Sequence, residues 1–300
     1  MSDEEAAPAP DHAAAREDPP LGPAPAAHRR PGLVALLFAH RALASILVAL
    51  PITATLGAVT APYPRGQAEL FDPGGLMLLE SLRLSRPALP ALAWSGAGFA
   101  LVFAALGLLP LGMLIAGLGR VGPVSAAFLF RRAGKHFGSL ALLFGVTLAA
   151  QLVTASLLAL LGGKLIDALR LVPPAEDITF LALFAVIFGI LSALGVVRDL
   201  AYVAAVHEGR GFYVAVTRAL GAASRRPLGT FFAWAWRAAL GALGLIAAAS
   251  LAPAARDATT AAVMVAFAMH QAALMGVAFA RGAWIARAMR SLMESAPRAE

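Results

Sequence analysis

The stretch FLALFAVIFGILSALGVV, residues 180–197, decides the fold class because it runs for eighteen residues without a single charge. As a helix it would be about 27 Å long, which is close to the ~30 Å hydrocarbon layer of a bilayer. Its apolar residues are continuous and do not alternate with polar ones, unlike those of a membrane-barrel strand. Backbone polar groups inside lipid must be paired within the segment, so the stretch predicts a transmembrane helix.

Five further blocks of the same kind predict an all-α, polytopic membrane bundle. The chain of 300 residues is 60% hydrophobic and 14% charged, whereas soluble proteins average about 45–50% and about 25%. We predict a disordered cytoplasmic tail at 1–31, rich in proline and acids, a transmembrane domain at 32–290, and a short cytoplasmic C-terminus at 291–300. The six spans are predicted at about 42–61, 90–118, 138–162, 178–200, 230–252 and 260–280.

The distribution of basic residues predicts the orientation of these spans. Of the 24 lysines and arginines, seventeen lie on the side that holds both termini and six on the other side, while Arg237 lies within the fifth span. The side richer in lysine and arginine is normally cytoplasmic, so both termini are expected inside the cell. The abundance of alanine, glycine and arginine is typical of a GC-rich bacterial genome, which makes the bacterial inner membrane the expected location.

Arginine-bearing segments with helical apolar spacing precede each odd-numbered span. They cover Leu33–Arg41, Ser125–His136 and Phe212–Arg226, and their starts lie 92 and 87 residues apart. Each would form a short amphipathic helix along the inner membrane surface and lead into a helical hairpin. The sequence therefore predicts three repeated units, although any array of hairpins with positive inner loops would look similar.

Residues 206–227, VHEGRGFYVAVTRALGAASRRP, resemble a cytoplasmic loop of bacterial six-helix membrane proteins related to the membrane domain of some glycerophosphoryl diester phosphodiesterases. Val214 departs from the loop pattern, which commonly has an acid there. The resemblance covers about 20 residues and implies a six-helix topology. The phosphodiesterase chemistry of those enzymes resides in a separate soluble barrel domain. The residues that match the pattern are Glu208, Gly211, Ala215, Val216, Arg218, Ala219, Arg225 and Arg226.

No motif in the chain points to catalysis, and we expect neither catalytic, cofactor-binding nor metal-binding residues. The chain lacks cysteine, and its six histidines show no metal-ligand spacing. None of the 17 acids lies in the middle of a predicted span, although carboxylates there are common in ion-coupled carriers. Asp199 comes closest, at the inner end of the fourth span beside Arg198, where we expect a local ion pair or a helix cap.

Three functional hypotheses remain open on this basis. The favoured one is a non-enzymatic multi-pass protein that acts through anionic lipid headgroups or a protein partner, with no role for nucleic acid. A small-solute transporter or channel component is the alternative, and it would need a polar route through the bundle. An intramembrane enzyme is the third hypothesis, and the few serines of the spans and His270 offer little support for it.

Polar residues at similar depths suggest a cluster inside the membrane. We predict that Arg237 faces the bundle and bonds to His270 or Gln271, with Gln151 nearby. The alternative is that Arg237 extends to the headgroups from an aromatic belt formed by its neighbours. The residues predicted to contact lipid headgroups are Arg131, Arg132, Lys135, Arg218, Arg225 and Arg226.

Overall fold

The computed structural model describes residues 26–64, 76–170, 172–250 and 260–295, and every regular element among them is a helix. Six helical segments are long and apolar enough to cross a membrane, and one of them, Leu89–Leu118, consists of two consecutive helices. The helices are η1 (Ala27–Arg29), α1 (Pro31–Thr60), α2 (Leu76–Leu84), α3 (Leu89–Leu106), α4 (Leu108–Leu118), α5 (Ala126–Lys135), α6 (Phe137–Leu169), α7 (Ala175–His207), α8 (Phe212–Arg225), α9 (Pro227–Ser250) and α10 (Thr260–Glu294).

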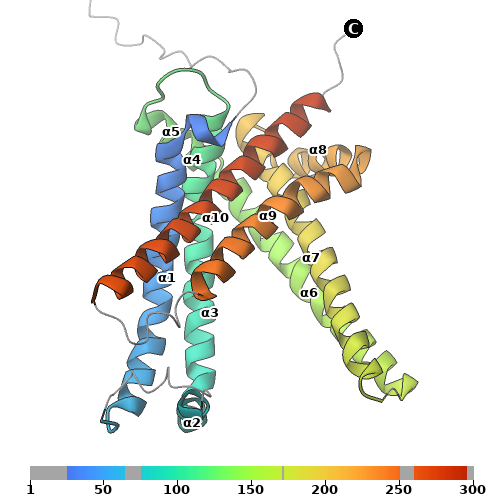
Figure 1. Ribbon diagram of the computed structural model, residues 1–300. Coiled ribbons are helices and arrows are strands. Elements are labelled where there is room, and N and C mark those ends of the chain that lie inside the picture. The colour runs from blue at the N-terminus through green and yellow to red at the C-terminus, as the bar shows by residue number, and fades with distance from the viewer. Residues whose placement is uncertain (1–25, 65–75, 171, 251–259, 296–300) are drawn as a thin grey trace, which may run out of the picture.

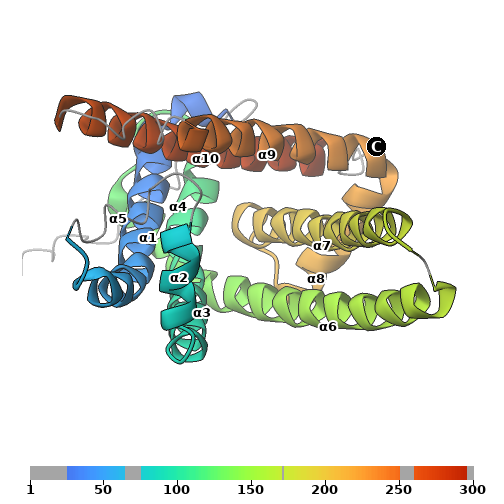
Figure 2. The same ribbon diagram turned by 60° about the horizontal axis from the view of Figure 1, so that its bottom comes forward.

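The long helices associate as three consecutive pairs: α1 with α3 and α4, α6 with α7, and α9 with α10. Figure 1 shows that the first and second pairs come together at one end of the molecule and diverge toward the other, and Figure 2 shows α9 and α10 running alongside each other across the first pair. The fold therefore confirms the predicted all-α membrane architecture with six candidate spans.

One predicted feature of the first unit is wrong. Leu33–Arg41 does not form a separate interfacial helix but is the beginning of α1, which runs unbroken from Pro31 to Thr60. No glycine or proline lies between Leu33 and Leu50, so nothing interrupts the helix there. The other two short helices exist as α5 and α8. Helix α8 ends just before Pro227, because the residue that precedes a proline disfavours the helical conformation.

The second span is broken near Pro110. Helix α3 ends at Leu106 and α4 begins at Leu108. Pro110 has no N–H to donate to the carbonyl of Leu106, four residues earlier, so the helical hydrogen-bond ladder is interrupted at this point. Gly107 occupies the break and lets the imidazole of His40 approach, since a Cβ at this position would lie 3.0 Å from His40 Nε2.

The core lies at the end where the pairs meet. It is formed by α4, the last turns of α7 and the last turns of α10, with α5 and α8 packed beside them. The outer parts of the spans instead present apolar side chains to their surroundings, which is what helices in contact with lipid require. Large side chains that are fully buried in the core include Leu114, Ile115, Leu200, Val203, Ile285 and Met289.

An arginine that precedes each pair bonds a backbone carbonyl near the end of the second span of that pair. Carbonyls at a helix end have no partner within the helix and carry partial negative charge, so a guanidinium stabilises them. The equivalent bond in all three units supports the predicted repeat. The three bonds run from Arg30 Nε to Gly117 O at 3.1 Å, from Arg132 Nε to Val206 O at 3.3 Å, and from Arg218 Nη2 to Leu292 O at 2.9 Å.

The last residues of the segment predicted as a tail belong to this packed end. Ala27 is buried, and Arg30 also donates to the carbonyls of Arg120 and Gly122. The rest of the predicted tail lies outside the described residues.

Candidate functional site

A buried carboxylate ties α7 to α10 at the inner edge of the core. Asp199 is 1% exposed, and both of its oxygens accept hydrogen bonds from the guanidinium of Arg281, including one from Nη2 at 2.6 Å. Trp284 Nε1 donates a further bond to Asp199 Oδ2 at 2.8 Å, and Arg198 Nη2 lies 3.5 Å from Oδ1. The carboxylate is thereby fully paired, as a buried charge must be.

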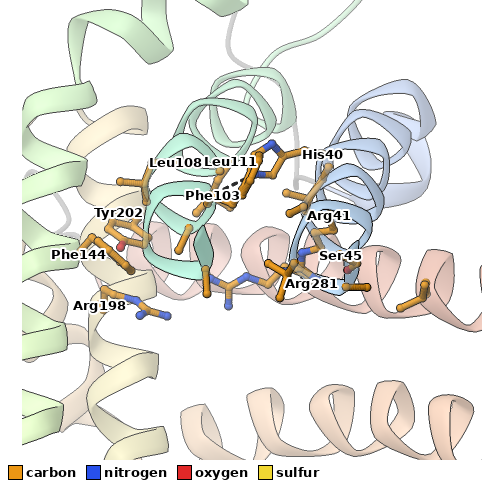
Figure 3. A pocket seen from close by; sticks show the side chains of 18 of the residues that line it. His40, Arg41, Ser45, Phe103, Leu108, Leu111, Phe144, Arg198, Tyr202 and Arg281 are labelled. Atoms are coloured by element: carbon orange, nitrogen blue, oxygen red, sulfur yellow. Dashed lines mark hydrogen bonds between the residues drawn. The ribbon is translucent and has the colours of Figure 1, made fainter. Parts of the chain in front are cut away.

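Arg281 also lines a cavity of about 780 Å³, which we call the first cavity. Helices α1, α3, α4, α7 and α10 contribute to its wall, together with Phe144 of α6. Figure 3 shows that polar side chains from separate helices surround it. Its polar residues are His40, Arg41, Ser45, Arg198, Tyr202 and Arg281.

Two polar atoms in this wall are buried without a hydrogen-bond partner in the described part of the chain. They are the hydroxyl of Tyr202, whose side chain is 1% exposed, and Nε of Arg198. The guanidinium of Arg198 lies 5.6 Å from the centroid of the Tyr202 ring, so the two donors are neighbours. Leaving a buried donor unpaired costs about 1–3 kcal/mol. A ligand that brings acceptor oxygens to this point would recover that free energy.

The first cavity also carries an excess of positive charge. Arg41, Arg198 and Arg281 contribute three cations, and Asp199 behind them is the one carboxylate that the described residues place against this group. Arg41 forms no ion pair with a carboxylate of the described residues, and Asp199, the carboxylate whose charge acts on it, is already bonded to Arg281. Because charges removed from water are costly unless compensated, the arrangement favours an anionic occupant.

The remainder of the first cavity is apolar. From the arginines it continues along α1 and α3, past Val48, Ile52 and Ala100, toward the outer parts of those helices. His40, at the other side of the cavity, is held by a 3.0 Å hydrogen bond between its Nε2 and Phe103 O. The cavity thus combines a polar, cationic end with a hydrocarbon-like extension.

In the predicted intramembrane cluster, the recorded contacts of Arg237 and Gln151 are with other residues and not with one another or with His270 and Gln271. Arg237 Nη1 donates to Ala233 O in its own helix, and its guanidinium lies 4.7 Å from the centroid of the Trp236 ring. Gln151 Nε2 instead donates to Leu191 O at 2.9 Å and so joins α6 to α7. His270 and Gln271, both half-buried on α10, take part in neither interaction. The cluster stays a prediction that these contacts do not support.

The basic residues predicted to contact lipid headgroups fall into two groups. Arg132, Arg218 and Arg225 use their guanidinium groups within the protein, and Arg225 Nη1 bonds Ser295 O at 2.9 Å beside the bonds of Arg218. Burial, assisted by the positive charges of Arg132 and Lys135, lowers the pKa of His136 at the end of α5. The exposed members without a recorded bond inside the protein are Arg131, Lys135 and Arg226, whereas Arg225 is exposed but bonded to Ser295 O.

Sequence reasoning missed the residues that form the first cavity. Asp199 was singled out by its position, but its main partner is Arg281 and not the adjacent Arg198. Arg41 and Arg281 flank their apolar blocks and look like ordinary loop charges in the sequence. One signal in the sequence could have placed them within helices. The helical spacing of apolar residues continues on both sides of each arginine, as α1 and α10 do in the structure.

The fold and this cavity define the class of the molecule: a multi-pass helical membrane protein. Comparison with protein-family models, with curated proteins and with solved structures finds no match for this chain. The resemblance of residues 206–227 therefore identifies no family, and the function must be argued from the cavity itself.

Proposed function

We propose that this protein binds a membrane lipid with an anionic phosphate headgroup in the first cavity and acts as a non-enzymatic, lipid-binding membrane protein. The observation that carries the proposal is the convergence of three arginines and an unpartnered tyrosine hydroxyl on a cavity with an apolar extension. Phosphate oxygens suit arginine and hydroxyl donors, and an acyl chain suits the apolar wall.

Binding is favoured over catalysis because the groups around the cavity are already committed to structural bonds. The oxygens of Asp199 hold Arg281 and Trp284, so this carboxylate is not available as a general base. His40 bonds a backbone carbonyl of α3 and not the hydroxyl of Ser45. The alternative function, transport of a small polar solute, is less well supported, because the wall between α1 and α3 is apolar along Val48 and Ile52.

Replacing Arg41 with glutamine is expected to weaken binding of phosphatidylglycerol about tenfold, because one charge-assisted contact to the phosphate is lost. Native mass spectrometry of the purified protein in mild detergent, with added phosphatidylglycerol or phosphatidylcholine, measures this. The wild-type protein should prefer the anionic lipid.

Arg131→Gln is the matched control for that experiment, since Arg131 is an exposed arginine of α5 that lines neither this cavity nor another described one. It removes the same charge and should leave the affinity unchanged within about twofold. Equal losses in the two variants would mean diffuse attraction to a basic surface, and the proposed cavity function would then be rejected.

We further propose that the end where the pairs meet faces the cytoplasm in a bacterial inner membrane, with both termini on that side. The excess of arginine around α5 and α8 supports this orientation.

The chain has no cysteine, so single cysteines introduced into it report accessibility cleanly. Ala175→Cys should react with an impermeant thiol reagent added to intact cells, whereas Gly134→Cys and Gly221→Cys should react only after lysis. Labelling of Gly134→Cys in intact cells would reverse the orientation.

A further inference from the structure

A second cavity of about 310 Å³ lies on the other side of Arg41 and Arg281. Both arginines belong to the walls of the two cavities, which are therefore neighbours across this pair of side chains. Helices α9 and α10 form most of the second cavity, and Trp234, Arg237 and Trp284 stand around its polar end. The two cavities thus share two arginines, and each also has one arginine of its own: Arg198 in the first and Arg237 in the second.

Arg237 brings an unneutralised charge to the second cavity. Its recorded contacts are with a backbone carbonyl of its own helix and with the ring of Trp236, and none of the described carboxylates pairs with it. Four arginines consequently surround the two cavities, with Asp199 as their compensating carboxylate within the described ranges. This charge exceeds what a single phosphate monoanion needs.

The apolar extensions of the two cavities lead in different directions. The first follows α1 and α3, whereas the second runs between α9 and α10 along Gly241, Leu245 and Val277. Gly241 keeps these two helices close, since a Cβ there would lie 3.3 Å from Val277 Cγ2. Figure 1 shows that α9 and α10 cross α1 and α3 at an angle, so the two helix pairs are not parallel. A lipid with one phosphate and its two adjacent chains fills one extension and leaves the other without a tail.

We propose, building on the lipid-binding function above, that the two cavities together hold one lipid with two phosphatidyl groups joined by a short bridge. One phosphate lies in each cavity, with Arg41 and Arg281 between them, and each pair of acyl chains leaves its cavity along the apolar helix faces that lead from it into the surrounding lipid. A diphosphate carried on a single chain fits less well, because it supplies only one tail. The chemistry recognised is that of cardiolipin-type lipids.

Arg237→Gln tests this proposal because Arg237 lines the second cavity and not the first. Binding of tetraoleoyl cardiolipin and of dioleoyl phosphatidylglycerol is compared by native mass spectrometry, with the intact chain in mild detergent. Linking two phosphates raises the effective concentration of the second, so the wild-type protein should bind cardiolipin at least about tenfold more tightly. Arg237→Gln should abolish that preference and leave phosphatidylglycerol affinity within about twofold of wild type. Arg198→Gln should weaken the binding of both lipids.

The outcomes separate the two proposals. Equal wild-type affinity for both lipids would overturn the two-phosphate inference and leave lipid binding in the first cavity intact. An equal loss for both lipids in Arg237→Gln would also overturn it, because the second cavity would then have no distinct occupant. Failure of the wild-type protein to bind either lipid would instead reject the proposed function itself. Ala238→Leu, which adds bulk to the second cavity without altering charge, should reproduce the lost preference.

Discussion

Asp199→Asn is expected to destabilise the purified protein by about 3–5 kcal/mol, the usual cost of removing one partner from a buried ion pair. The substitution keeps the size of the side chain but leaves Arg281 without its counter-charge, and it exchanges an acceptor for a donor facing the guanidinium. Asp199 is 1% exposed, so water cannot compensate. Thermal unfolding in detergent, followed by intrinsic tryptophan fluorescence, should show a large drop in the melting temperature, since Trp284 lies in the same cluster.

Glu208→Gln is the matched control, because Glu208 lies at the C-terminal end of the same helix and also pairs with arginines, at 3.4 Å to Arg218 and 3.7 Å to Arg210. Its side chain is 20% exposed, so its loss should cost less than about 1 kcal/mol. Adding Arg281→Met to Asp199→Asn should restore part of the stability, because the uncompensated charge is then gone. If Asp199→Asn proved as mild as Glu208→Gln, the ion pair would not organise this core.

The spans could be predicted from the sequence because the membrane imposes a simple requirement on length and polarity. Hydropathy located all six long helices. Hydropathy failed at the helix ends that form the core. Helix α10 continues to Glu294, well past the predicted end at 280, because Trp284, Ile285 and Met289 are buried against protein while the charges between them interrupt the apolar run.

The first cavity could not be predicted for a related reason. A single sequence shows which residues are charged but not which helices approach one another. Asp199 and Arg281 are 82 residues apart, and the nearer candidate partner, Arg198, is the weaker one. The recorded contacts of Arg237 are with Ala233 and Trp236 of its own helix, and its pairing with residues of α10 stays a prediction. The position of a residue along a span predicts its depth in the membrane. It does not predict the rotation of the helix about its axis, which decides the neighbours that the side chain meets.

Arg218→Met is expected to lower stability by about 2 kcal/mol, the second large effect, because it removes the arginine that holds the end of α10. Arg218 donates to Leu292 O at 2.9 Å, to Ser295 O at 3.0 Å and to Glu208 Oε1 at 3.4 Å. Bonds from a charged donor contribute about 1.5–3 kcal/mol each when buried, and partial exposure of this helix end reduces their sum. Methionine keeps the helix propensity and the length of the stem, so the loss reports on the guanidinium.

Hydrogen exchange distinguishes the two roles that Arg218 can have. If it holds the end of α10, the amides of Ser291–Glu294 should exchange faster in Arg218→Met, while binding of phosphatidylglycerol is unchanged. Arg226→Met, which removes an exposed arginine one residue beyond α8, should leave the exchange of these amides as it is in the wild type. If Arg218 served mainly to contact headgroups, as the sequence predicts, its loss would weaken lipid binding and leave both the exchange and the melting temperature as they were. Unchanged exchange would also remove the support that this bond gives to a threefold repeat, because the third unit would lack a functional equivalent of Arg30 and Arg132.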